Sequence, residues 1–478
     1  MGKSLKINFL LNFVNTITVV LFPMITFPYA SRILLADGIG QVNFLKSIID
    51  YVGMFVCLGI PMYAVREIAR VRDDHVKRNQ STAEILYLNL LLTFLGYLVI
   101  IILAVFLDKI STEIPLFIIL SLSILLMTLG CEWFYKGIED FKYITIRGLF
   151  IKVISLFLLF FLVKSKQDIM WYAVYNVFGV TGGNIFNFIR LRKYVKLEDI
   201  KLANLDIWKH LKPSLNSFVL NLYFAIYITL NTIMLGFLST NESVGYFTAA
   251  TKLTQISLAV VNSLGIVLLP RLSNLLSKNQ NAEFHDVSQK ALRFIIALSL
   301  PMTAGLMLVA PYIIPIFCGD NYSPAITNLV LVAPVVLIIG LSSFIGIQIL
   351  YPQGKEKIVI ICTLSGTCVN ILFNFILIPR LSYNGAAIGA VIGQLVLFIS
   401  LSWLGRKNIK LKWDYSFVLY LFATLIMSSI IYLLQFLEVS MVYKLIFSIV
   451  FGGIVYGTIL AIVRDDIYLQ IRKFIIRR

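Results

Sequence analysis

Long apolar stretches separated by short polar loops run through the whole chain. Fourteen stretches contain about 18 or more mostly apolar residues, at 7–30, 42–64, 83–107, 114–136, 148–165, 168–189, 214–238, 246–270, 291–316, 325–351, 358–379, 384–405, 415–437 and 441–463. About 20 apolar residues in a helix cross the ~30 Å hydrocarbon core of a bilayer. The pattern therefore predicts an all-α polytopic membrane protein with about fourteen transmembrane helices, and the longest loop, 190–213, leaves no room for a catalytic domain outside the membrane.

Composition and charge agree with this class. Of the 478 residues, 59% are apolar and only 14% are charged, whereas soluble domains carry about 25% charged residues. The net charge is +17, and in a soluble protein that excess would suggest a nucleic-acid partner. Here 33 of the 41 Lys and Arg residues fall on the side of the N-terminal tail. Since cytoplasmic loops carry the Lys/Arg excess, we expect both termini in the cytoplasm and no nucleic-acid partner.

The two halves of the chain resemble each other. Gly40 precedes an apolar run with Lys46, and Gly245 precedes one with Lys252 at a nearly constant offset along the chain. Repeats of six helices with the same orientation are a transporter architecture with the substrate path between the halves. We therefore predict a first lobe at 1–190, a cytoplasmic linker at 191–213, a second lobe at 214–405, and two further helices with a cytoplasmic tail at 406–478.

A few charged side chains fall inside or at the ends of these helices. Such groups are costly in hydrocarbon and normally face a cavity or a partner. Lys46 with Asp50, and Glu132 with Lys136, are spaced i,i+4 and so share a helix face. Each pair also fits a self-neutralising pair without further function, and the remaining cations also fit snorkelling to headgroups. The functional alternative is a cationic cavity for an anion such as a phosphate, with these candidates: Arg32, Lys46, Asp50, Arg66, Lys252 and Arg271.

Asparagines form a second polar group within the apolar runs. Asn12, Asn221 and Asn262 join Glu132 and Lys136 as secondary candidates for the cavity or for ion coupling, because an amide in hydrocarbon needs a partner. The alternative is that these asparagines form hydrogen bonds between neighbouring helices.

Motifs for enzymes, nucleotides and metals are absent from the sequence. The five Cys lack metal spacing, and the three His (75, 210 and 285) fall in predicted loops. We therefore expect no enzyme activity, no cofactor and no metal. Any active transport must then use an ion gradient, such as one of protons or sodium ions, the membrane potential or a substrate gradient.

Several segments together resemble polysaccharide flippases of the multidrug/oligosaccharidyl-lipid/polysaccharide exporter superfamily. They are PYASRIL at 28–34 with Gly38-Ile39-Gly40, LGIPMYAVREIA at 58–69, EWFYKGIEDFKY at 132–143, VGYFTAATKL at 244–253, LPRLS at 269–273 and Gly385-Ala386-Ala387. The matches cover roughly residues 9–400.

The resemblance implies a Wzx-type flippase with a MATE-like fold in the bacterial cytoplasmic membrane. Such proteins move undecaprenyl-pyrophosphate-linked oligosaccharide units from the inner to the outer leaflet by alternating access, for O-antigen, capsule or exopolysaccharide. The implied partners are this lipid-linked glycan, membrane lipids, a polysaccharide polymerase and other assembly proteins. The alternatives are a lipid II flippase, a cation-coupled drug antiporter and, from another class, a membrane-embedded glycan ligase or polymerase.

Overall fold

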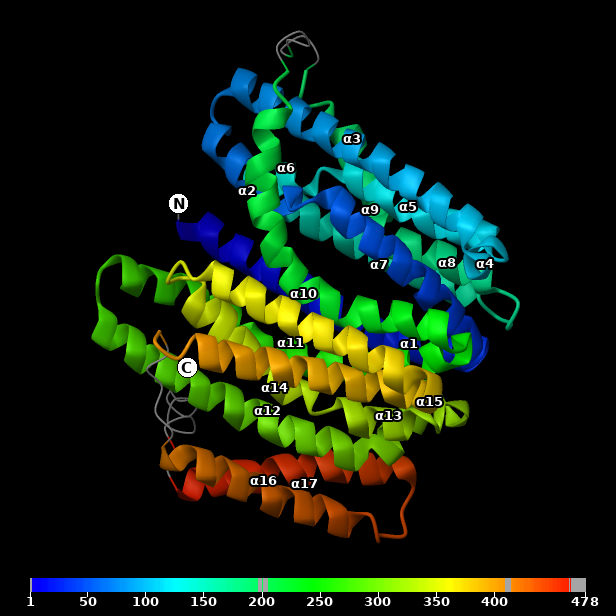
Figure 1. The fold of residues 1–478 in the computed structure, drawn as a ribbon, viewed down its shortest axis with the longest axis vertical. Coiled ribbons are helices and arrows are strands. Elements are labelled where there is room, and N and C mark those ends of the chain that lie inside the picture. Colours follow the sequence, from blue (N-terminus) through cyan, green and yellow to red (C-terminus); the bar gives the residue numbers. More distant parts are fainter. Residues whose placement is uncertain (1, 197–199, 201–204, 409–413, 464, 466–478) are drawn as a thin grey trace. The chain divides into compact units, whose positions relative to one another are not determined.

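A computed structural model describes residues 2–196, 200, 205–408, 414–463 and 465. Within these residues all regular structure is helical (Figure 1), which confirms the predicted class. The first helices are α1 (Gly2–Cys57), α2 (Ile60–Val71), α3 (His75–Phe106), α4 (Asp108–Ser111), α5 (Ile114–Gly130), α6 (Glu132–Gly137), α7 (Phe141–Leu162), α8 (Ile169–Val177), η1 (Phe178–Gly182), α9 (Gly183–Leu191), η4 (Trp208–His210) and α10 (Leu211–Leu238). The later ones are α11 (Asn241–Ser277), α12 (Asn281–Cys318), η5 (Asp320–Tyr322), α13 (Ala325–Val332), α14 (Val335–Ser343), η6 (Phe344–Leu350), α15 (Glu356–Leu404), α16 (Tyr415–Leu434) and α17 (Met441–Ile462).

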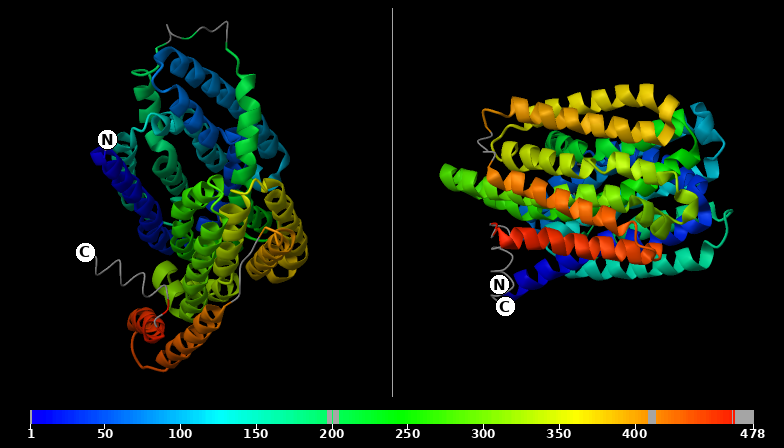
Figure 2. Two further views of the ribbon diagram at one scale, coloured as in Figure 1. Left: turned by 90° about the vertical axis from the view of Figure 1, so that its left-hand side faces the viewer. Right: turned by 90° about the horizontal axis from the view of Figure 1, so that it is seen from below.

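The chain divides into two compact units, Met1–Gly245 and Tyr246–Arg478. Within each unit the long helices lie roughly parallel to one another (Figure 2). Ten stretches of the described residues are long and apolar enough to cross a membrane as continuous helices. Two of them, in α1 and α15, contain two predicted segments each, and α8–η1–α9 and α10 account for two more. Each of the fourteen predicted segments therefore lies in a helical part of the structure.

Two helices are too long for one crossing and break at a single residue. An unbroken helix of 56 residues, as in α1, would measure about 84 Å. Leu35 interrupts it with φ 57° and ψ −173°, and Ser382 interrupts α15 with φ 51° and ψ −129°. Because each break leaves two legs that can span ~30 Å, α1 and α15 each supply two of the predicted segments.

The two legs of α15 pack closely through a row of glycines. A Cβ atom on Gly385 would lie 2.4 Å from the carbonyl oxygen of Leu377, and one on Gly389 would lie 2.2 Å from Oδ1 of Asn374. A Cβ on Gly393 would lie 2.6 Å from Cβ of Asn370. The GxxxG spacing in the sequence thus marks a close-packing face, and the asparagines opposite it act between helices rather than in a cavity.

Large apolar side chains cover the outer surface of the helices. Phe106 is 77% exposed on α3, Phe161 is 67% exposed on α7 and Ile462 is 75% exposed on α17. In water such a surface would carry a large hydrophobic penalty, whereas in a bilayer it is matched by lipid tails. The protein is therefore a multi-pass membrane protein.

The C-terminal end of helix α10 is bonded to α4 of the first unit. The ammonium group of Lys109, on α4, lies 2.7 Å from the carbonyl oxygen of Gly236 and 2.8 Å from that of Ser239. Burial lowers the pKa of Lys109. These bonds satisfy carbonyl groups that the last helical turn leaves open. The contacts thus place α10 in the first unit, Met1–Gly245. The lobes predicted from the sequence had instead assigned 214–238 to the second lobe. The repeat of six helices remains a prediction.

The last two helices, α16 and α17, pack on each other and on α12. Arg293 of α12 donates from Nε to Asp414 at 2.8 Å, and Asp414 also accepts from the backbone N–H of Ser416 at the start of α16. Burial raises the pKa of Asp414, but the hydrogen bonds from Arg293 and Ser416 outweigh it and hold that pKa below its usual value. The hydroxyl of Tyr456 donates to the carbonyl of Ala297 at 2.8 Å, which fixes α17 on the same helix.

Candidate functional site: a charged cavity in the first unit

A cavity of about 430 Å³ lies within the first unit, between α1, α5 and the α8–η1 helix. Its wall is largely apolar but includes one carboxylate, one ammonium group, an amide and two hydroxyl groups. The lining residues are Lys46, Ile49, Asp50, Gly53, Met54, Cys57, Gly59, Pro61, Leu120, Ser123, Ile124, Met127, Asn176, Val177, Val180 and Thr181. The cavity therefore holds a few polar side chains within an otherwise apolar helix bundle.

Lys46 and Asp50 are the charged groups of this wall. Their side chains form an ion pair along α1, as the i,i+4 spacing predicts. The pair is only half-buried, with 29% of the Lys46 side chain and 48% of the Asp50 side chain exposed. Both groups can therefore exchange their mutual contact for water or for a ligand.

A sharp turn after Cys57 forms one end of the cavity. Leu58 and Gly59 have φ values of 40° and 72°, and α2 then begins with Pro61 in its first turn. This differs from the predicted helix at 42–64, because two consecutive left-handed residues cannot continue a right-handed helix. Gly59 also touches α10: a Cβ atom there would lie 2.4 Å from the backbone of Ser214 and of Phe218.

The second predicted pair, Glu132 and Lys136, lies on the short helix α6 rather than in the preceding membrane helix. Cys131, with φ 42°, ends α5 and starts α6. The ammonium group of Lys136 lies 2.8 Å from Glu132, and a guanidinium nitrogen of Arg147, on α7, lies 3.1 Å from the same carboxylate. The pair is thus a triad in which Glu132 has two cationic partners.

Two cations inside the first unit were missed by the sequence reasoning, Arg147 and Lys152. The Arg147 side chain is only 11% exposed, and its Nε and Nη1 atoms are buried without a hydrogen-bond partner in the described part of the chain. The Nζ atom of Lys152 is likewise buried and unbonded there. Lys152 lies inside the predicted helix at 148–165. A charged residue at that position could have been recognised from the sequence as a candidate for the cavity.

The other predicted cations lie elsewhere. Arg32 is exposed on α1 just before the break at Leu35, and Arg66 is exposed on α2. In the second unit, Lys252 is half-buried on α11, and Arg271 is exposed and lies 3.6 Å from Glu283 of α12. The structure therefore brings together Lys46 and Asp50, and convergence of all six residues on one cavity remains a prediction.

The structure describes the side chain of one of the three secondary asparagine candidates. Asn262 is half-buried on α11. The side chains of Asn12 and Asn221 lie outside the described residues.

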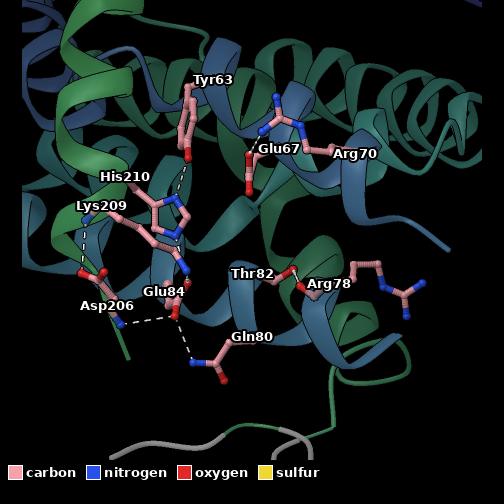
Figure 3. A network of polar contacts seen from close by, with 10 residues as sticks. All are labelled: Tyr63, Glu67, Arg70, Arg78, Gln80, Thr82, Glu84, Asp206, Lys209 and His210. Atoms are coloured by element: carbon pink, nitrogen blue, oxygen red, sulfur yellow. Dashed lines mark hydrogen bonds and ion pairs between the residues drawn. The ribbon is translucent and has the colours of Figure 1, made fainter. Parts of the chain in front are cut away.

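A second polar cluster joins α2, α3 and the segment before α10 (Figure 3). Glu84, 2% exposed on α3, accepts from His210 at 3.0 Å and from Lys209 at 2.6 Å. It also accepts from the side chain of Gln80 at 3.0 Å and from the backbone N–H of Asp206 at 3.2 Å. The sequence placed His210 in a loop; it is buried because the segment before α10 lies against α3. Among the described residues no group of His, Cys, Asp and Glu has the arrangement of a metal site.

The helical bundle and its polar cavity define the class of a membrane transporter. In fold, the chain matches the structure "Lipid II flippase MurJ, inward closed conformation" with a TM-score of 0.76 and 16% identity, over 96% of this chain and 99% of that chain. It also matches an inward-facing MATE-family multidrug transporter of the MOP superfamily with a TM-score of 0.64 and 16% identity, over 82% and 97% of the two chains.

The chain belongs to the polysaccharide biosynthesis protein family, whose model matches residues 5–276. A MatE family model also matches residues 216–376. A protein named as an O-antigen transporter from Shigella dysenteriae is 28% identical over 81% of this chain and 94% of its own length. One of the same name from Escherichia coli K12 is 24% identical over 82% and 94%. These matches confirm the family resemblance seen in the sequence.

Proposed function

We propose that this protein is a flippase for lipid-linked oligosaccharides in the bacterial cytoplasmic membrane. Its substrate is an undecaprenyl-pyrophosphate-linked repeat unit, moved from the inner to the outer leaflet by alternating access during O-antigen, capsule or exopolysaccharide synthesis. The observation that carries the proposal is the similarity to O-antigen transporters along 94% of their length. We further propose that both termini are cytoplasmic and that a polysaccharide polymerase uses the product.

The chemistry of such a substrate fits a cavity of this kind. A diphosphate and its sugars cannot cross hydrocarbon unaided, because desolvating an ion and many hydroxyl groups costs too much free energy. Lys46 supplies a positive charge inside the first unit, and its partner Asp50 can accept hydrogen bonds from sugar hydroxyl groups. We propose that Arg32, Arg66, Lys252 and Arg271 extend this surface, with Glu132, Lys136 and the asparagines as secondary groups. Transport of this kind would draw on an ion gradient or on the membrane potential.

Leaflet position is the direct test. The purified protein is placed in liposomes with undecaprenyl pyrophosphate carrying a fluorescent oligosaccharide, and dithionite added outside bleaches only the outward-facing molecules. We expect bleaching of about half in protein-free vesicles and of nearly all in vesicles with the protein. Equal bleaching in both preparations contradicts the proposal.

A lipid II flippase is the second candidate, favoured by the fold match to MurJ. The same assay with fluorescent lipid II separates the two. We expect faster exchange of the oligosaccharide substrate; faster exchange of lipid II would favour the second candidate.

A further inference from the structure

His210 lies between two partners at the start of α10. Its Nδ1 atom is 2.6 Å from the hydroxyl oxygen of Tyr63 on α2, and its Nε2 atom is 3.0 Å from Glu84 on α3 (Figure 3). The imidazole is 1% exposed. Both ring nitrogens are therefore occupied, although the ring is almost fully buried.

This arrangement satisfies the imidazole in both of its protonation states. In the neutral ring, Nε2–H donates to Glu84 and Nδ1 accepts from the Tyr63 hydroxyl. In the imidazolium ion both nitrogens donate, and the hydroxyl group, which can also accept, turns its own proton away. Tyr63 is only half-buried, so that proton can reach water. Hence His210 can gain a proton without leaving a buried polar atom unbonded.

Five charged side chains belong to the polar cluster around His210 (Figure 3). Glu84, Glu67 and Asp206 are the carboxylates around the ring; Lys209 and Arg70 are the cations, and Arg70 lies 3.6 Å from Glu67 on α2. These five groups sum to −1, so a proton on His210 brings the cluster to zero.

Arg78, also on α3, does not enter that sum. Its guanidinium group contacts the ring of Phe134 and the carbonyls of Arg72 and Tyr194 instead.

We propose that His210, held between Tyr63 and Glu84, is a proton-binding site that fastens the start of α10 to α2 and α3. Its use in driving transport rests on the proposed function, whereas proton binding itself does not. When His210 carries the proton, its hydrogen bond to the Glu84 carboxylate becomes an ion pair.

The site has a short physical connection to the cavity. His210 directly precedes α10, whose residues Ser214 and Phe218 lie against Gly59. Gly59 lines the cavity that holds Lys46 and Asp50. Since no side chain separates α10 from this turn, a shift of the first turns of α10 must move the cavity wall.

Histidine NMR tests proton binding without altering the site. A protein carrying His75→Gln and His285→Gln keeps His210 as its sole histidine, and ¹³C labelling at the imidazole then gives one signal. Histidine is the side chain that normally titrates between about pH 5 and 8. We expect this signal in nanodiscs to change with pH as one proton is bound. A signal that stays constant while the protein remains folded overturns the proposal.

Removing the neighbouring charge sharpens that test. Glu84→Gln keeps an acceptor oxygen but removes the negative charge beside the ring, so we expect the protonation curve of His210 to move towards acid. Asp286→Asn on α12, which removes an exposed carboxylate, is the matched control and should leave the curve unchanged. An unchanged curve in Glu84→Gln contradicts the role of the carboxylate.

Coupling is measured separately, with the fluorescent oligosaccharide assay under an imposed pH gradient. We expect the gradient to accelerate bleaching in the protein with His285→Gln and to have no effect in the protein with His210→Gln. An undiminished response in His210→Gln overturns the use of this proton in transport. Titration without any flipping would instead contradict the proposed function and leave the proton site standing.

Discussion

The two polar regions of the first unit use charge in different ways. In the cavity, Lys46 and Asp50 bond mainly to each other, and both remain partly open to solvent. At the end of the unit, Glu84 is 2% exposed and accepts from four donors on two segments of chain. The first pair can release its contact, whereas the second carboxylate cannot lose its partners without remaining buried and unpaired.

Burial and the number of partners therefore distinguish a charge available to a ligand from a charge that holds the fold. An exposed ion pair contributes about 0–1 kcal/mol to stability. Breaking a buried pair by removing one partner costs about 3–5 kcal/mol, since the other group is left uncompensated. Substitutions at Glu84 should therefore mainly lower the stability of the protein, whereas substitutions at Lys46 should mainly slow transport.

The largest effect is expected at Glu84. Glu84→Leu leaves Lys209, His210 and the N–H of Asp206 without their acceptor, and we expect a loss of about 3–5 kcal/mol in the free energy of unfolding. Denaturant titration of the purified protein in micelles measures it. Asp286→Leu, at an exposed carboxylate paired with Lys290 at 2.6 Å, is the control and should cost less than about 1 kcal/mol. Equal losses in the two variants would remove the distinction drawn above.

An intermediate effect is expected at Asp414, which is about a quarter exposed and joins α12 to α16. Asp414→Ala removes a helix cap and the partner of Arg293, and we expect a loss of about 1–2 kcal/mol at pH 7. Because the pKa of Asp414 is lowered in the folded protein, its contribution is present above the unfolded pKa of about 3.9 and is lost as the pH falls through the folded value. The wild type and the variant should therefore differ equally at pH 7 and pH 5 and converge below about pH 4. A difference that grows on acidification would contradict this assignment.

Lys46 should show the opposite balance, with a small change in stability and a large change in transport. Lys46→Gln removes a half-exposed ion pair, so we expect less than about 1 kcal/mol in stability. We expect at least a tenfold slower exchange of the fluorescent oligosaccharide, equivalent to about 1.4 kcal/mol in the barrier.

Lys290→Gln, at the exposed i,i+4 pair on α12, is the matched control for Lys46→Gln and should flip at the wild-type rate. Export of surface glycan in cells, with membrane insertion measured alongside, gives a second readout for Lys46→Gln and for Lys252→Gln. Unchanged glycan in both of these variants would end their assignment to the substrate surface.

Most of the fold follows from apolar run lengths, because a bilayer imposes one length on every crossing. The breaks at Leu58–Gly59 and Cys131 could not be found in this way, since an apolar run continues through each of them and only the backbone turns. The close-packing face of α15 was visible in the spacing of Gly385, Gly389 and Gly393.

The site was less predictable than the fold. The i,i+4 spacing placed Lys46 beside Asp50 because both lie on one helix. Arg147 and His210 were missed as site residues because their partners, Glu132 and Glu84, lie on other helices or segments, and no local pattern encodes such a contact. Arg147 lies one residue before the predicted helix at 148–165 and Lys152 lies inside it, and neither was counted among the candidates.

The smallest effect is expected at Arg66, which belongs to the predicted cationic surface but lies exposed on α2, one helix beyond the turn that lines the cavity. Among the described residues Arg66 forms no ion pair, so Arg66→Gln should change stability by less than about 0.5 kcal/mol. Since an exposed charge acts on a diphosphate mainly through water, where ions screen it, we expect oligosaccharide exchange to slow by about twofold, and the effect to disappear near 1 M salt. A tenfold loss that persists in salt would instead place Arg66 in direct contact with the substrate, and the contrast between exposed and half-buried charges would then fail for the cavity.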